Sequence, residues 1–305
     1  MAVVATGFFD GVHLGHRQVI QALVSCARQK GEEAIAVTFA QHPRAVLQQD
    51  ARTLRLLNSP QEKEALLRSL GVDRVETLPF DRAFARLTAG EYIRDVLAGR
   101  FGATALVLGY DNRLGSDCLT PDRIRPLAEG MGLEVVIVPP VDAAAVSTAP
   151  ASTGGTISST KIRESLEQGR VEAAEEMLGY AYRLRGVVVG GKQLGRKLGF
   201  PTANLRLYDP LKLVPARGVY LTEVEVLGRH GWGMTNVGDI IETHIFDFDE
   251  DIYGLDLEIR FRRRLREMRP FDSLDALKAQ LAADKAACLA LIAAGGPAPA
   301  QSFPA

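Results

Sequence analysis

The chain has few cysteines and no large excess of charge of either sign, and both absences exclude classes of protein. Its 305 residues include only Cys26, Cys118 and Cys288, which are widely spaced and form no Cys-x-x-Cys pair. This spacing argues against a disulfide framework or a zinc site and fits a reducing cytosol. Lysine and arginine number 36 and aspartate and glutamate 37, so the net charge of −1 gives no electrostatic reason to expect a nucleic-acid partner.

Long hydrophobic runs are also absent. No apolar stretch approaches the ~20 residues that cross a membrane, and the amino end has no basic segment followed by an apolar one, as a secretion signal would. We therefore expect a cytoplasmic protein without a membrane partner. The length suffices for two ordinary domains, each with its own core.

The most informative segment that is present lies at the amino end, where residues 7–16 read Gly-Phe-Phe-Asp-Gly-Val-His-Leu-Gly-His. Residues 3–6 before it form an expected buried strand, and apolar residues after it recur at helical spacing. A strand-to-helix turn offers free backbone N–H groups and a helix dipole that attract phosphate. His13 and His16 share one face of the first turn, where they suit the charge that builds up on a triphosphate during nucleotidyl transfer.

The first half of the chain alternates strands with helices. Capping boxes at Ser59–Glu62 and Thr88–Glu91 begin two of the helices. This alternation predicts a doubly wound, Rossmann-like parallel sheet, with ligands beyond the carboxyl ends of its strands. Besides residues 3–6, the expected strands are 33–39, 72–78, 103–109 and 133–139.

The second half changes pattern after a Ser/Thr/Ala/Gly-rich stretch at 146–156, which we expect to be a mobile loop, and a helical stretch at 158–179. Short β-rich runs without helices between them predict a small antiparallel β-barrel. A final helix at 272–292 is expected to pack through a stripe of Leu274, Leu277, Leu281 and Ala286. The expected barrel strands are 185–189, 218–226, 232–237, 242–248 and 255–261. The expected domain boundaries are 1–165, a helical linker at 166–183, 184–293, and a disordered tail at 294–305.

Further polar groups follow the expected strands of the first domain. His42 and Arg44 come after strand 33–39, and Asp111 comes after strand 103–109. Residues 157–163 begin a helix with hydroxyls, free N–H groups and two cations, which could clamp a second phosphate. In the second domain, residues 190–199 are rich in glycine and can let the backbone approach phosphate closely.

These segments together resemble the bacterial bifunctional riboflavin kinase/FAD synthetase family over nearly the whole chain, to about residue 292. The run Leu-Gly-Arg-Lys-Leu-Gly-Phe-Pro-Thr-Ala-Asn at 194–204 matches the signature of the kinase half. The His-x-Gly-His motif alone indicates only the nucleotidyltransferase superfamily. The resemblance implies that the carboxyl domain converts riboflavin and ATP to FMN and ADP, and that the amino domain converts FMN and ATP to FAD and pyrophosphate.

The resemblance also implies roles for individual residues. His13 and His16 are the expected catalytic residues of the adenylyltransferase, and Glu242 is the expected general base for the ribityl 5′-hydroxyl, with His244 on the same face of its strand. Thr202 and Asn204 would supply oxygen ligands to Mg²⁺ bound with ATP. The expected flavin-binding residues are His42, Arg44 and Arg266. The expected nucleotide-binding residues are Gly7, Phe9, Asp10, Gly11, Asp111, Ser159, Thr160, Arg163, Gly190, Lys192, Gly195, Arg196, Gly199 and Thr202.

The partners implied are the small molecules riboflavin, FMN and ATP, with no tightly bound redox cofactor required and the oligomeric state left open. Three departures from the family pattern stand out. Phe8 occupies a position that is usually small or polar. Asn112 and Leu114 replace aromatic residues that are common after Gly-x-Asp, and we expect this replacement to alter the flavin or adenine wall. Between Asn236-Val237-Gly238 and Glu242 the usual Arg-Pro-Thr stretch and loop are missing. Either the active-site loop is short, or residues are missing from this sequence.

A short loop would leave the adenylyltransferase intact while impairing the kinase. The alternatives to a bifunctional enzyme are therefore an FMN adenylyltransferase whose barrel only binds flavin, and a non-catalytic flavin sensor.

Overall fold

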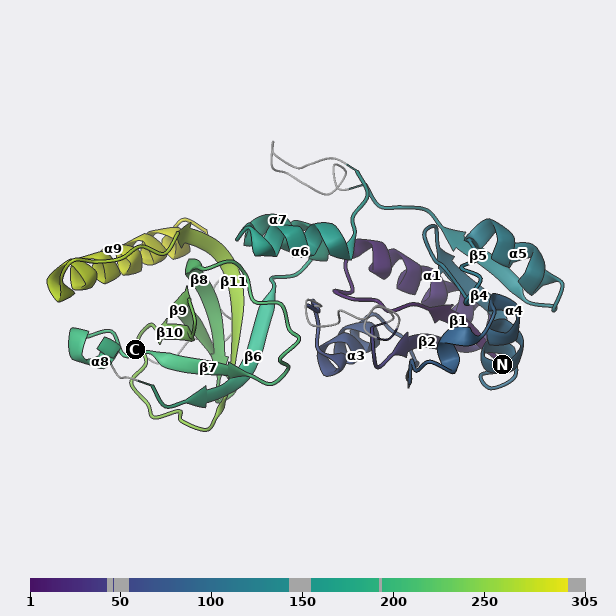
Figure 1. Ribbon diagram of the computed structural model, residues 1–305, viewed down its shortest axis with the longest axis horizontal. Helices are drawn as coiled ribbons and strands as arrows, with labels where there is room; N and C mark the ends of the chain where they lie inside the picture. The colour runs from purple at the N-terminus through teal and green to yellow at the C-terminus, as the bar shows by residue number, and fades with distance from the viewer. Residues whose placement is uncertain (43–45, 47–54, 143–154, 192–193, 296–305) are drawn as a thin grey trace. The chain divides into compact units, whose positions relative to one another are not determined.

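The computed structural model describes residues 1–42, 46, 55–142, 155–191 and 194–295 (Figure 1). The chain divides into two compact units, Met1–Ser159 and Thr160–Ala305, each with its own sheet. The expected loop at 146–156 and the expected tail fall almost wholly outside the described residues. Within the described ranges, no helix is both long and apolar enough to cross a membrane.

The first unit contains a five-stranded parallel sheet in the order β3-β2-β1-β4-β5, which confirms the predicted doubly wound architecture. Its strands are β1 (Ala2–Thr6), β2 (Glu33–Phe39), β3 (Arg74–Leu78), β4 (Ala103–Gly109) and β5 (Glu134–Val138). Its helical elements are α1 (Leu14–Lys30), α3 (Pro60–Ser69), η2 (Phe84–Arg86), α4 (Ala89–Glu91), η3 (Tyr92–Ala98) and α5 (Pro121–Glu129).

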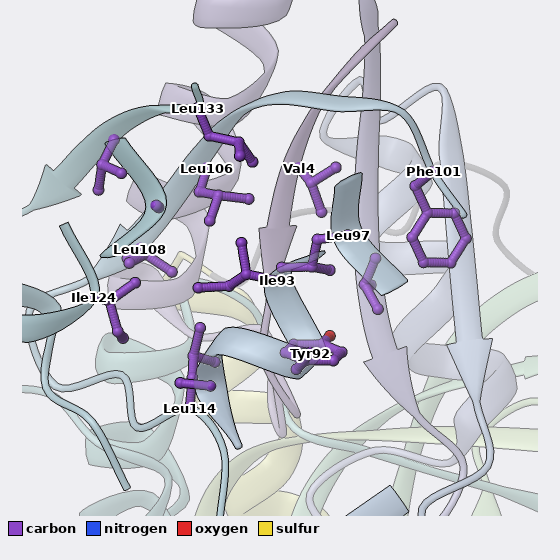
Figure 2. Close-up of a cluster of buried hydrophobic side chains, with 14 of the residues drawn as sticks. Val4, Tyr92, Ile93, Leu97, Phe101, Leu106, Leu108, Leu114, Ile124 and Leu133 are labelled. Atoms are coloured by element: carbon purple, nitrogen blue, oxygen red, sulfur yellow. The ribbon is translucent and has the colours of Figure 1, made fainter. Parts of the chain in front are cut away.

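The sheet is buried on both faces because helices cover each side of it. Along β1, Val4 packs into one hydrophobic cluster, while Val3 and Ala5 pack into the other, as the two-residue period of a strand requires. Figure 2 shows the cluster around Val4, in which side chains from η3 and β4 interdigitate. Burial on both faces explains why these strands read as continuous apolar runs.

The strand order places the end of β1 at the sheet's switch point. After β1 the chain passes through α1 to β2, which pairs with β1 on one side, and β4 pairs with β1 on the other side. Parallel sheets bind ligands in the crevice where the order reverses. The His-x-Gly-His turn connects β1 to α1 and therefore lies at this position.

The second unit is built on a closed antiparallel barrel in the order β10-β7-β6-β11-β8-β9, which confirms the predicted barrel. Its strands are β6 (Arg183–Val189), β7 (Ala203–Leu207), β8 (Gly218–Val226), β9 (Arg229–Val237), β10 (Ile241–Ile245) and β11 (Asp256–Arg266). The helices of this unit are α6 (Ser159–Glu167), which begins at the division, α7 (Val171–Leu178), α8 (Leu194–Leu198) and α9 (Leu274–Ala293).

Successive residues of each barrel strand point to opposite faces of the barrel wall. A chain of buried hydroxyls joins three strands, because Thr235 Oγ1 lies 2.8 Å from Thr222 Oγ1 and 2.9 Å from Thr243 Oγ1. On the opposite face of β8, Val219 and Leu221 form a hydrophobic cluster that includes Cys288 of α9. Helix α9 therefore covers one outer face of the barrel.

The predicted packing stripe of this last helix is only half right. Leu277 and Leu281 are partly buried, but Leu274 is 58% exposed and Ala286 is also exposed. The buried positions of α9 are instead Asp284 and Cys288. Apolar spacing could not predict that Asp284 is buried, because this carboxylate is buried together with Arg266 of β11.

Candidate functional sites

The turn after β1 holds two histidines in contact. His13 is the N-cap of α1, and its Nδ1 accepts a hydrogen bond from the backbone N–H of His16 at 3.3 Å. The two imidazole rings stack with centroids 3.7 Å apart and an interplanar angle of 15°. A Cβ on Gly15 would lie 3.2 Å from the His13 ring, so the glycine between the histidines keeps space for this stack.

The same turn is suited to an anion. The first turn of α1 carries no acidic residue, and its backbone N–H groups stand at the positive end of a 17-residue helix. Burial, followed by the neighbouring charges of His13 and Lys63, lowers the pKa of His16 well below its ordinary value. His16 is therefore neutral near pH 7, and its buried Nδ1 has no hydrogen-bond partner within the described structure.

Other residues expected to bind nucleotide shape this turn. Phe9 and Gly11 adopt positive φ angles of 53° and 85°, and the Phe9 ring is buried against His16 with centroids 5.4 Å apart. Asp10 is 4% exposed, and its Oδ1 accepts hydrogen bonds from the backbone N–H groups of Leu57 at 2.9 Å and Asn58 at 3.3 Å. Its carboxylate therefore ties the turn to the segment before α3. Gly7 forms the turn's backbone bond to β2, donating to Val37 at 3.0 Å.

The ends of β2 and β4 and the start of α6 contribute three of the other expected residues. His42 is half-buried and its ring meets Phe8 edge to face at 4.5 Å, while Asp111 is exposed after β4. Ser159 Oγ donates to the backbone oxygen of Asp10 at 2.8 Å, so it is fixed beside the histidine turn. Arg44 lies outside the described residues. Thr160 and Arg163 belong to the second unit.

Two of the departures from the family pattern have structural explanations other than a ligand wall. The Asn112 side chain accepts from Gly109 N at 2.7 Å and donates to Thr6 O at 2.9 Å, so it joins the ends of β4 and β1. Leu114 is buried in the cluster of Figure 2. Both residues therefore have structural roles within this unit, and an altered flavin or adenine wall at these positions stays a prediction.

In the second unit, the expected metal ligand and base lie side by side. Glu242 of β10 is directly opposite Asn204 of β7. With the amide oriented to suit its neighbours, Asn204 donates to Glu242 Oε1 at 3.2 Å and accepts from Gly191 N at 3.3 Å. A Cβ on Gly191 would fall 2.1 Å from the end of the Asn204 side chain, so a larger residue at position 191 would displace this amide.

The segment between β6 and β7 brings more of the predicted residues to this place. Gly195 approaches the backbone oxygen of Phe200 so closely that a Cβ would lie 2.3 Å from it, and Gly199 has a φ angle of 85°. Gly190 and Arg196 are exposed. Lys192 lies outside the described residues.

Two cavities meet at Thr202. The smaller has a volume of about 240 Å³ and is lined by Arg196, Ala203 and residues 248–253. The larger, about 430 Å³, is lined by Asn204, Glu242, His244, Arg266 and the α9 residues Leu277 and Leu281. Thr202 lines both cavities, whereas Asn204 and Glu242 line only the larger one.

The short connection before Glu242 does not displace it. Residues 238–240 close the hairpin between β9 and β10, with Gly238 N donating to Ile240 O at 3.1 Å. Glu242 stays opposite Asn236 in the ladder, and Asp239 forms an ion pair with Arg217 at the rim of the larger cavity.

Two further side chains of the larger cavity are already engaged. Arg266 Nε lies 3.0 Å from both oxygens of Asp284, and its Nη2 donates to Oδ2 at 2.7 Å. His244 Nδ1 lies 2.9 Å from the backbone oxygen of Pro201, and burial lowers its pKa. Because that oxygen only accepts, the Nδ1 of His244 carries the proton.

Sequence reasoning missed Asp284 and Lys63. Lys63 is 4% exposed on α3, and it precedes Leu67 by one helical turn on the buried face. A lysine at an apolar position of an amphipathic helix is the signal that could have identified it.

The comparisons with known proteins agree with this geometry. The family model for FAD synthetase matches residues 1–150, and the family model for riboflavin kinase matches residues 178–292. A solved structure from Streptococcus pneumoniae, whose title names a macrolide-efflux protein, superposes with a TM-score of 0.86 at 34% identity, covering 94% of this chain and 93% of that one.

Two curated relatives are bifunctional riboflavin kinase/FMN adenylyltransferases. The protein of Listeria monocytogenes is 33% identical, and that of Escherichia coli K12 is 34% identical. Each alignment covers 93% of this chain and 90% of the relative. The chain therefore belongs to the family of bifunctional riboflavin kinase/FMN adenylyltransferases.

Proposed function

We propose that the chain carries out both steps from riboflavin to FAD, the kinase step in its second unit and the adenylyl transfer in its first. The observation that carries the bifunctional assignment is the pairing of Glu242 with Asn204 across β10 and β7, because the short hairpin leaves this pair intact. We assign the adenylyltransferase to residues 1–165, the connecting helices to 166–183 and the kinase to 184–293.

In the kinase, riboflavin occupies the larger cavity and ATP the smaller. Glu242 accepts the proton of the ribityl 5′-hydroxyl, whose oxygen then attacks the γ-phosphorus of ATP while ADP leaves. The oxygen atoms of Thr202 and Asn204, with the Glu242 carboxylate beside them, fit a hard cation, so Mg²⁺ would be held there with the ATP phosphates. Bound Mg²⁺ would neutralise charge on those phosphates.

In the adenylyltransferase, the α1 turn binds the ATP phosphates. A phosphate oxygen of FMN attacks the α-phosphorus in line, and pyrophosphate leaves. His13 and neutral His16 donate hydrogen bonds to the charge that develops, while Ser159, fixed beside the turn by its bond to Asp10 O, holds the pyrophosphate side. The enzyme needs to form no covalent intermediate.

Separate substitutions test the assignment of sites to units. His16→Ala should abolish FAD formation from FMN and leave FMN formation from riboflavin unchanged. Asn204→Ala should do the reverse, so each variant is the folding control for the other. Loss of both activities in one variant would show that the two sites are not separate.

A second candidate is an FMN adenylyltransferase whose barrel binds flavin without phosphorylating it. The observation in its favour is the three-residue turn at 238–240, which leaves Ile240 50% exposed at the rim of the larger cavity. Saturable riboflavin binding with no FMN formed from riboflavin and ATP would select this candidate.

A further inference from the structure

One buried cation close to the histidine turn has no role in the mechanism above. The Lys63 side chain extends from α3 to the carboxyl ends of β1 and β2, where it is 4% exposed. Its Nζ donates to the backbone oxygens of Phe8 at 3.1 Å and Phe39 at 3.3 Å. A buried ammonium group costs free energy unless its hydrogens are satisfied, so a position of this kind needs a compensating reason.

Phe8, which departs from the family pattern, completes the environment of the Lys63 ammonium group. Its ring centroid lies 4.0 Å from Lys63 Nζ, a cation–π contact, and the same ring meets His42 edge to face. Two carbonyl oxygens and one aromatic face thus account for the three N–H groups of the ammonium. A small or polar residue at position 8 would leave this cation without its aromatic cover.

The charge of Lys63 acts on the groups of the turn. The charge of Asp10 raises the pKa of Lys63, and that of Lys63 lowers the pKa of His16. The rings of His13 and His42 lie around these groups, in the turn and after β2. The positive charge of Lys63 lowers the pKa of His16, in addition to the larger effect of burial and that of His13. It therefore favours the neutral imidazole in the stack.

We propose that Lys63 is a positioning residue for adenylyl transfer, whose buried ammonium, covered by Phe8, fixes the turn that carries His13 and His16. The proposal rests on the proposed function of the first unit. Lys63 touches neither substrate in this account, because all its donors are engaged by the protein. It acts through the backbone of Phe8 and through its field at His16.

The test compares Lys63→Met with Thr38→Val. Thr38 is 1% exposed, and its Oγ1 donates to the same Phe8 oxygen at 3.1 Å, so Thr38→Val removes a neutral donor and leaves the charge. Lys63→Met should lower kcat for FAD formation at least tenfold, with KM for ATP changed less than threefold. Thr38→Val should lower kcat less than threefold, and riboflavin phosphorylation should be unchanged in both variants. Equal losses of kcat in Lys63→Met and Thr38→Val would overturn the role of the Lys63 charge.

A pH profile separates positioning by charge from simple packing. Burial lowers the pKa of Lys63 to about 8, opposed by the charge of Asp10. Lys63 is therefore protonated at pH 7, and wild-type FAD formation should decline as pH rises through about 8. Lys63→Arg should keep activity to higher pH, since arginine stays charged. An unchanged alkaline decline in Lys63→Arg would contradict the proposal.

Histidine NMR supplies a readout that does not depend on activity. In Lys63→Met the pKa of His16 should rise, with the resonance assigned through a His16→Gln variant. An unchanged His16 titration would overturn the proposal even if activity fell. If the wild type itself makes no FAD from FMN, the proposed function of the first unit fails, whereas a normal wild type with an equally active Lys63→Met variant refutes only the role of Lys63.

Discussion

The ion pair between Arg266 of β11 and Asp284 of α9 should hold the last helix on the barrel. Asp284 is 5% exposed, and its carboxylate accepts bonds from two nitrogens of Arg266 and from Gln280 Nε2 at 2.6 Å. Substituting Asp284→Ala leaves the guanidinium of Arg266, whose side chain is 19% exposed, without its carboxylate partner. Removing one member of a buried pair costs about 3–5 kcal/mol.

We expect the lower end of this range, about 3 kcal/mol, because the exposed part of Arg266 can still be hydrated. A loss of that size lowers the melting temperature of the second unit by about 10 °C, at roughly 3–4 °C per kcal/mol. Because Leu277 and Leu281 of the same helix line the larger cavity, KM for riboflavin should also rise.

The assay is thermal unfolding with and without riboflavin, together with initial rates of FMN formation. Lys278→Ala, an exposed substitution on the same helix, is the matched control and should change neither quantity. The double variant Arg266→Met/Asp284→Leu should recover most of the lost stability, since an apolar pair removes both charges. Destabilisation by Asp284→Ala below 1 kcal/mol, or no larger than that of Lys278→Ala, would refute the reasoning.

Three further predictions concern single groups. Glu242→Gln should lower the rate of riboflavin phosphorylation by a factor of about 10²–10⁴, as expected for loss of a general base, with FAD formation from FMN unchanged; an active variant would remove Glu242 from this role. Burial raises the pKa of Cys288 to about 12, so in the native protein a thiol reagent at pH 8 should modify exposed Cys118 first and Cys288 only after unfolding, which mass spectrometry of the labelled peptides checks. Because the pKa of folded His16 is lowered, the unfolded state takes up its proton first, and the first unit should lose up to about 1.4 kcal/mol per pH unit as pH falls below about 6.5; denaturant unfolding at several pH values should show a flatter dependence in His16→Gln.

Much of the first unit follows from sequence because its signals are local. The run at 33–39 is β2 residue for residue, and both capping boxes form as predicted, with Ser59 accepting from Glu62 N and Thr88 from Glu91 N. Continuous apolar runs between helices leave few alternatives to a parallel sheet.

The second unit was harder to predict because its decisive features are not local. Strand β7 (Ala203–Leu207) was not expected, because Asn204 and Arg206 interrupt its apolar pattern. Strand β11 runs on to Arg266 through three successive arginines, and Arg262 pairs with Glu223 of β8. Such pairs depend on strand register, which spacing along one chain does not reveal.

Dependence on contacts between distant segments also limits how much of the functional sites can be predicted from sequence. His13, His16, Thr202, Asn204 and Glu242 are motif residues and could be named from sequence. Lys63 and Asp284 bond to partners distant along the chain, and Asn112 bonds to the backbone oxygen of Thr6. Their assignments needed the three-dimensional structure.

The central claim, two successive ATP-dependent activities in one chain, is tested most directly by a chromatographic time course. The protein is incubated with riboflavin, ATP and Mg²⁺, and a parallel reaction starts from FMN. The account predicts that FMN appears first and FAD follows, and that the second reaction yields FAD without a lag. FAD formed only when FMN is supplied would contradict the kinase assignment and show that the three-residue turn before Glu242 is not tolerated.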